Sequence, residues 1–161
     1  MTRDERLFRE FERLANRDDF YDWLGLYPIT VETGRLVGGL EYDDRLTMPS
    51  PPGPGSVHGG VVASLIDVSG VGAVLSTLEN PVTASIATTN LDIDFTETAE
   101  STLRSEAVVT AVDKPEFEAT VTVTTAGESD TDSVLIAEGT VICRVSNNDS
   151  VVETFSPHPG P

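Results

Sequence analysis

The chain has 161 residues and a formal net charge of −17, from 27 acidic and 10 basic side chains, nine of which are arginine. This length suits one domain with a sizeable core better than two. The negative charge argues against nucleic acids and anionic membranes as partners, because phosphate recognition needs clustered Lys and Arg. An acidic, lysine-poor surface suits concentrated salt, where the Debye length is only about 3 Å at 1 M. We therefore expect a halophilic source.

Targeting and metal-binding signals are absent from this sequence. It has no run of 18 uninterrupted apolar residues and is charged from Arg3 onward, so we expect no signal peptide, no membrane span and a cytoplasmic protein. Its one cysteine, Cys143, lies in an alternating apolar stretch, which favours a small buried side chain over a nucleophile. With only His58 and His158 as histidines, we expect no metal site and no cofactor.

The first part of the chain predicts a helix followed by a hairpin. Between residues 4 and 18, apolar side chains recur on one helical face, so residues 1–19 are assigned to an N-terminal helix. Residues 18–26 predict a turn or a short second helix. A strand at 29–32, a turn at Thr33-Gly34 and a returning strand at 35–42 predict a hairpin.

A Pro/Gly-rich loop at 49–55 leads into His58-Gly59-Gly60 and a long apolar segment. This segment predicts a helix that ends near residues 79–81, because Pro81 cannot continue it. A helix that is apolar on nearly every side is normally buried at the centre of a fold. Asp67 is its one ionisable residue, and an isolated carboxylate there is paired, neutralised or used in chemistry.

The spacing of His58 and Asp67 limits what one chain can do. Nine residues place them on opposite sides of a helix and about 13 Å apart along its axis. The glycines leave the first-turn N–H groups open to a polarised carbonyl or an oxyanion. A shared site would therefore need a two-fold dimer, with Asp67 of one chain facing the glycine turn of the other. A plainer interpretation also stays open, in which His58 only caps the turn and Asp67 bonds Ser64 or a backbone group.

Four alternating stretches follow the helix and predict strands. Each has one apolar and one more polar face, as an antiparallel sheet covered on one side requires. A central helix beside such a sheet gives an α+β arrangement. Residues 147–161 are polar with several prolines and are expected to form a flexible tail. The four predicted strands are 87–95, 103–111, 117–123 and 135–145.

The run Val57-His58-Gly59-Gly60, with Asp67 nine residues after the histidine and then the sequence TTNLDIDF at 88–95, resembles PaaI-type thioesterases of the hotdog superfamily. The similarity extends over residues 20–146, which are assigned to one hotdog domain. The resemblance implies a curved antiparallel sheet wrapped around the central helix and a homodimer or homotetramer. It also implies hydrolysis of an acyl- or aryl-coenzyme A thioester to free acid and coenzyme A at the dimer interface.

The resemblance also implies roles for particular residues. Gly59 or Gly60 would offer a backbone N–H to the thioester carbonyl, and His58 would shape that turn. Asp67 of the partner chain would act as general base or nucleophile. Thr88 lies where the family often has a Ser or Thr that positions water.

One expected group is missing from the loop before the helix. The family commonly has an Asn or Gln about six residues before the histidine, where this chain has Pro52, and residues 46–57 contain neither amide. Loss of one oxyanion donor costs about a hundredfold or more in rate. The sequence therefore leaves open a slow enzyme, a replacement donor such as Ser50 or Ser56, or an inactive protein.

Two other functions remain open on sequence grounds. One is a non-catalytic acyl-coenzyme A binding or regulatory protein, which the missing amide favours. The other is a hotdog hydratase or dehydratase. In each case the coenzyme A phosphates need cations, and Arg104 and Lys114 are the candidate substrate-binding residues, with Arg144 a third; each is equally compatible with a plain surface charge.

Overall fold

The structure is a computed structural model that describes residues 1–17, 19–49, 52–127, 131–147 and 149–158. Three helices and eight strands, with two short 3-10 turns, follow one another along these residues. In chain order the elements are α1 (Arg3–Arg17), α2 (Asp19–Leu24), β1 (Leu26–Glu32), β2 (Arg35–Leu40), η1 (Asp44–Leu46), β3 (Thr47–Met48), β4 (Ser56–Val57), α3 (Gly59–Ser76), η2 (Pro81–Thr83), β5 (Ile86–Phe95), β6 (Leu103–Asp113), β7 (Glu116–Thr125) and β8 (Leu135–Val145).

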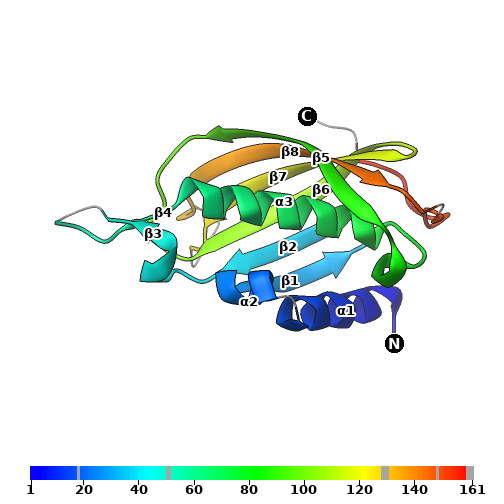
Figure 1. Cartoon of the computed structure of the whole chain (residues 1–161), viewed down its shortest axis with the longest axis horizontal. Coiled ribbons are helices and arrows are strands. Elements are labelled where there is room, and N and C mark those ends of the chain that lie inside the picture. Colours follow the sequence, from blue (N-terminus) through cyan, green and yellow to red (C-terminus); the bar gives the residue numbers. More distant parts are fainter. Residues whose placement is uncertain (18, 50–51, 128–130, 148, 159–161) are drawn as a thin grey trace.

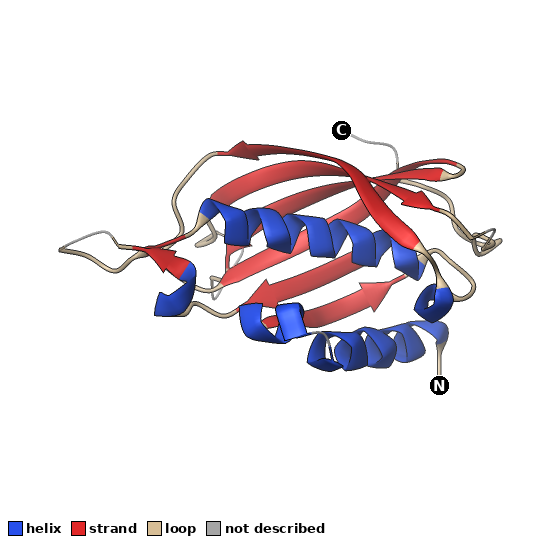
Figure 2. Ribbon diagram, in the orientation of Figure 1, coloured by secondary structure: helices blue, strands red, loops and turns tan. Residues whose placement is uncertain are grey.

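The main layer is a six-stranded antiparallel sheet in the order β1-β2-β6-β7-β8-β5. It curves around α3, which runs along its concave face (Figures 1 and 2). Helices α1 and α2 lie beside the β1 edge, and β5 forms the opposite edge. The predicted α+β class, the N-terminal helix, the hairpin and the four later strands are all confirmed.

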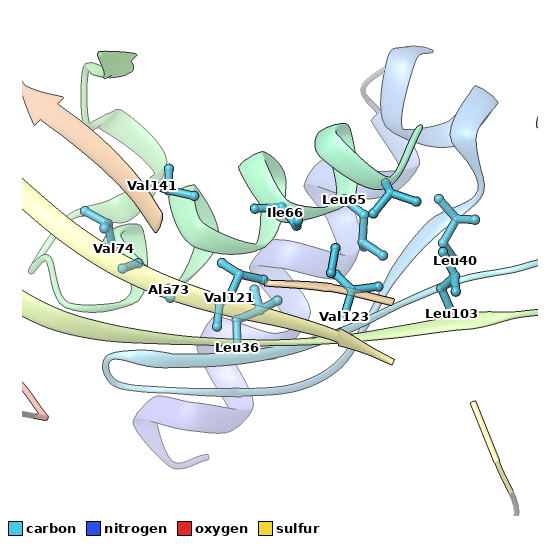
Figure 3. Packing of buried hydrophobic residues seen from close by; sticks show 14 of the residues in the cluster. Leu36, Leu40, Leu65, Ile66, Ala73, Val74, Leu103, Val121, Val123 and Val141 are labelled. Atoms are coloured by element: carbon cyan, nitrogen blue, oxygen red, sulfur yellow. The ribbon is translucent and has the colours of Figure 1, made fainter. Parts of the chain in front are cut away.

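The core lies between α3 and the inner face of the sheet. Ile66, Ala73 and Val74 of α3 have no exposed surface, and they pack among inward-facing residues of the strands, such as Val121 and Val123 (Figure 3). The helix approaches the sheet closely at Gly70, where an added Cβ would lie 2.6 Å from a methyl carbon of Val141. The prediction of a central buried helix is therefore confirmed.

Helix α3 ends at Ser76, earlier than the sequence predicts. Side chains and the backbone N–H groups of a tighter last turn, rather than further α-helical turns, satisfy its last carbonyl groups. The Thr77 hydroxyl donates to the Val74 carbonyl at 2.7 Å, and Arg3 donates to the carbonyls of Ser76 and Leu78 at 3.1 and 2.7 Å. The first helical residue of α1 thus holds the end of α3.

By length and composition alone, α3 could cross a membrane, since its 18 residues have a mean hydropathy of 1.6. Half of this segment is buried inside the fold. Because the sheet already covers one side of the helix, we explain its apolar character by packing within the domain.

Strand β5 differs from its predicted pattern. The sequence predicts that the odd-numbered residues from Ala87 to Phe95 share the inner face. A β-bulge interrupts the pairing with β8 between Thr88 and Asn90, so the inward parity changes along the strand. Thr88 faces α3 before the bulge, and Ile93 packs against the core after it. The prediction is wrong for residues 87–89, and Ala87 is exposed.

Two further features were not expected. A small hairpin of β3 and β4 precedes α3. After β8, the described residues 149–158 of the expected tail make backbone hydrogen bonds to the domain: Val152 N–H donates to Thr77 at 2.8 Å, and His158 N–H donates to Val109 at 3.1 Å. The ring of Phe155 lies against Gly34, in the turn between β1 and β2.

Candidate active site

The first turn of α3 offers one free backbone donor. The Gly60 N–H donates to Nδ1 of His58 at 2.9 Å, and the N–H groups of Val61 and Val62 donate to the His58 carbonyl at 2.8 and 3.2 Å. Among the described residues, none accepts a hydrogen bond from the Gly59 N–H. Of the two predicted glycine donors, Gly59 is therefore the one available to a ligand.

His58 fixes this turn from both sides. As the N-cap of α3 it accepts from Gly60, while its own N–H donates to the Leu46 carbonyl at 2.9 Å. Because Nδ1 accepts this bond, a neutral His58 carries its proton on Nε2, and the imidazole is exposed. The structure thus places His58 where it shapes the turn, as the resemblance implies.

Asp67 lies on the side of α3 that the sheet leaves half-exposed. Gly60, Ser64, Asp67 and Val71 form a stripe along this side, since residues three and four apart share a helical face. Oδ1 of Asp67 accepts a hydrogen bond from the Thr88 hydroxyl at 2.6 Å. The alternative partner, Ser64, instead donates to the Gly60 carbonyl at 2.8 Å.

Strand β5 positions Thr88 for this contact. The bulge directly after Thr88 places the extra residue, Thr89, opposite β8, where its hydroxyl donates to the Ile142 carbonyl at 3.2 Å. Bulges of this kind aim a side chain differently from a regular strand and are common beside active sites. One carboxylate oxygen of Asp67 thus accepts the hydrogen bond from Thr88, and the other oxygen is left for a ligand.

Cys143 is a neighbour of this pair that the sequence did not assign to the site. It lies opposite Thr88 on β8 and is fully buried, which confirms the prediction of a buried side chain. Burial, and to a smaller extent the negative charge of Asp67, raise the pKa of this thiol to about 11, although a hydrogen bond with Thr88 acts in the opposite direction. Only the register of β5 against β8 shows that Cys143 lies beside Thr88.

One chain does not bring Gly59 and Asp67 together. Eight residues of helix separate them, a rise of about 12 Å. The ring of Phe95 covers Gly59, 3.7 Å from the position of an added Cβ, while Thr88 at the other end of β5 contacts Asp67. Strand β5 therefore follows α3 from the glycine turn to the aspartate and touches both halves of the predicted site.

The predicted coenzyme A cations lie away from Asp67. Arg104 and Arg144 each neighbour an inward-facing buried residue, Ser105 and Cys143, so they point to the sheet face opposite α3. Lys114 and Arg144 line one surface hollow at the end of β8, and Arg104 lines another. Their role in substrate binding stays a prediction.

Two remaining candidates concern the loop before α3. Ser50 lies outside the described residues. Pro52 is exposed, and Ser56 lies in β4, two residues before His58. Over the described part of the chain, no group of three or more His, Cys, Asp or Glu side chains could hold a metal ion.

Comparison with known proteins identifies the family of this chain. No family model matches the chain. The Halobacterium salinarum protein named "Putative esterase VNG_1336C" is 34% identical over 128 residues, which cover 79% of this chain and 84% of that protein. The chain belongs to the PaaI-type thioesterases of the hotdog superfamily.

Solved structures of thioesterases share the hotdog fold over most of this chain. A protein of the thioesterase superfamily is 26% identical with a TM-score of 0.73, covering 88% of this chain and 98% of its own. A thioesterase family protein from Silicibacter pomeroyi is 23% identical with a TM-score of 0.74, covering 88% and 96%. The E. coli PaaI protein of the phenylacetic acid degradation operon is 16% identical with a TM-score of 0.73, covering 90% and 96%. Membership in this family makes the chain a hydrolase, with thioester hydrolysis as its general chemistry.

Proposed function

We propose that this protein hydrolyses acyl-coenzyme A thioesters at two equivalent sites formed between the chains of a homodimer. The observation that carries the proposal is the division of the site: the free Gly59 N–H and the Asp67–Thr88 pair lie at opposite ends of β5. Each chain holds one half of two sites, and a two-fold axis would join the halves.

Strand β5 offers the surface for this dimer. It is ten residues long and pairs only with β8 in the described sheet, so its other edge has unpaired N–H and C=O groups. Its apolar side chains Leu91 and Phe95 are 38% and 55% exposed. Pairing with β5 of a second chain would satisfy the edge and cover both side chains.

Antiparallel pairing of the two β5 strands also joins the halves of the site. A two-fold axis near Leu91 and Asp92, midway between Thr88 and Phe95, would place the Phe95 end of one strand beside the Thr88 end of the other. Because Phe95 lies over Gly59 and Thr88 contacts Asp67, this register brings the free N–H of one chain toward the carboxylate of its partner.

The chemistry follows from these two groups. The Gly59 N–H, at the positive end of α3, would hold the thioester carbonyl and the negative charge that develops on it. Asp67 would accept a proton from a water molecule whose oxygen bonds to the carbonyl carbon, while Thr88 keeps the carboxylate oriented. The C–S bond then breaks, and the proton passes to the departing thiolate.

Two substitutions test the halves separately. Asp67→Asn keeps an acceptor for Thr88 but removes the base, so we expect kcat to fall at least a hundredfold with the dimer intact. Gly59→Pro removes only the free N–H, because Pro is favoured at the first helical position and His58 already has φ −59° and ψ 135°. We expect a loss of about a hundredfold from this change. Gly59→Ala keeps the N–H and is the matched control.

Mixing the two inactive variants tests the shared site. Refolding equal amounts of Asp67→Asn and Gly59→Pro chains yields half heterodimers, each with one site built entirely from unaltered residues. About a quarter of the wild-type activity should return, measured as thiol release from acyl-coenzyme A in high salt. Absence of recovery despite heterodimer formation would show that both groups act within one chain or not at all. Tight binding without thiol release by the wild-type protein would instead favour the binding protein.

A further inference from the structure

An apolar cavity lies beside α3, on the flank opposite β5. Helix α1 and strands β1 and β2 form its other walls, and its volume is about 90 Å³. In Figure 1, α1 lies beside the β1 edge of the sheet, and β2 is the next strand inward from that edge. The lining includes Phe11, Leu14 and Ala15 of α1 and Val68 and Val71 of α3.

This cavity adjoins the proposed site. Val68 directly follows Asp67 in the chain. Val71 lies four residues after Asp67, on the half-exposed stripe of α3. Side chains four apart on a helix are neighbours, with Cβ atoms about 5–6 Å from one another. A carbonyl group held at Asp67 would therefore have its acyl chain within one helical turn of the cavity.

The lining offers no free charge to an occupant. Its Ser69 hydroxyl is already hydrogen-bonded to Ser105 at 2.7 Å, and the Tyr27 hydroxyl donates to Glu41 at 3.0 Å. Burying a carboxylate among such walls without a partner is strongly unfavourable. The cavity therefore selects uncharged, apolar acyl groups and rejects dicarboxylic ones.

The cavity's size narrows this choice further. Each water-sized group needs roughly 15 Å³ of such a cavity. A volume of about 90 Å³ thus holds about six carbon-sized groups, arranged as a chain or as one ring. Widening it would require α1 to move, yet Phe11 of α1 lies against α3 at Gly72, and Arg3 holds the end of α3.

Building on the proposed function, we infer that the cavity beneath α1 binds the acyl group, and that the protein prefers thioesters of uncharged acyl groups of about four to eight carbons over longer or dicarboxylic ones. Helix α1 acts as the wall that limits chain length. Hydrolysis of a series from acetyl- to dodecanoyl-coenzyme A should peak in this range. Glutaryl- and adipyl-coenzyme A, which carry a second carboxylate, should show at least tenfold lower kcat/KM than pentanoyl- and hexanoyl-coenzyme A.

Substitutions on α1 test the assignment without changing the proposed catalytic groups. Ala15→Phe fills the cavity from the α1 side and should lower kcat/KM for hexanoyl-coenzyme A at least tenfold, leaving acetyl-coenzyme A within twofold. Leu14→Ala enlarges the cavity at a half-exposed position and should move the optimum to longer chains. Asn16→Phe adds the same ring at the next, exposed position of α1. It should change neither kcat/KM for hexanoyl-coenzyme A nor the optimum chain length.

The outcomes separate this inference from the proposed function. Hydrolysis of dicarboxylic substrates as fast as that of uncharged ones of the same length, or an equal effect of Ala15→Phe on all chain lengths, would overturn it; the second result is expected if a partner side chain fills the cavity. If no thioester is hydrolysed, the proposed function fails, and the thermal shift caused by hexanoyl-coenzyme A decides the inference. A shift that Ala15→Phe abolishes supports it, and no shift, or one that Ala15→Phe leaves unchanged, overturns it.

Discussion

At the scale of single residues, the hydrogen bond between His58 and Gly60 determines which backbone group remains for chemistry. Without the imidazole, two successive N–H groups would be open at the start of α3. With it, the turn keeps a single donor, Gly59, and its geometry is fixed by bonds on both sides. A preorganised donor of this kind costs no rearrangement when charge develops on a bound carbonyl.

Cys143 provides a prediction at this scale. Because the folded pKa is raised to about 11, the thiol should stay protonated and unreactive toward a disulfide reagent at pH 8. Between about pH 9 and pH 11 the unfolded chain loses this proton before the folded chain does. The free energy of unfolding should therefore be unaffected by this group below pH 9 and fall as the pH rises through that window.

Denaturant titrations from pH 7 to 11, with Cys143→Ala as control, measure this effect. The difference in unfolding free energy between the two proteins should change above pH 9, since other groups titrate in both. Rapid labelling of the thiol in the native protein at pH 8 would contradict the burial on which the argument depends.

The sequence could predict most of the site residues but not the role of each one. The distance between His58 and Asp67 along a helix follows from spacing alone, and so does the need for a second chain. Which glycine keeps a free N–H depends on the rotamer of His58, which has no sequence signal. The contact of Cys143 with Thr88 depends on strand register, which alternation does not fix.

At the scale of elements, the decisive feature is the bulge in β5. It lets Thr88 face α3 while Ile93, an odd number of residues away, faces it too. A regular strand would send one of them outward. Alternation in the sequence cannot reveal such a bulge, because no glycine marks it. Helices α1 and α3 and most of the other strands of the six-stranded sheet were predictable because their apolar patterns are long, whereas the two-residue strands β3 and β4 are too short to show a pattern.

The packing of α3 on the sheet gives the element-scale prediction. Gly70→Ala would place a methyl group 2.6 Å from Val141 on the neighbouring strand. The gain in helix propensity is about 1 kcal/mol, whereas overpacking a core costs about 1–3 kcal/mol. We expect a net loss of up to about 2 kcal/mol in the free energy of unfolding, measured by denaturant titration.

The double variant Gly70→Ala with Val141→Ala is the matched test of this cause. It removes the opposing methyl groups, so it should be less destabilised than the sum of the two single changes. Strict additivity would show that the loss at Gly70 has another origin than the contact with the Val141 methyl groups.

At the scale of the whole molecule, negative charge opposes both folding and pairing. The net charge is −17 per chain, and a dimer would double it. The described ion pairs of Arg35 and Arg45 lie on the surface, where such pairs contribute about 0–1 kcal/mol each. Salt in the solvent must therefore screen this repulsion. The net charge that causes it follows from composition alone, whereas the surface used for pairing does not.

Acidic side chains even face one another within the sheet. Asp94 of β5 lies directly opposite Glu138 of β8, and both are exposed. Like charges in this arrangement are destabilising. Screening should relieve them, because the Debye length falls from about 10 Å at 0.1 M to about 3 Å at 1 M.

We therefore predict that the melting temperature rises by several degrees between 0.1 and 2 M KCl, since each kcal/mol corresponds to about 2–4 °C for a chain of this size. Glu138→Lys turns the repulsive pair with Asp94 into an attractive one, so it should raise the melting temperature at 0.1 M KCl and reduce its rise with salt. Glu153→Lys makes the same charge change in an exposed position of the tail and should have the smaller effect. A melting temperature that is constant across this range of KCl would show that electrostatic repulsion does not limit the stability of the fold.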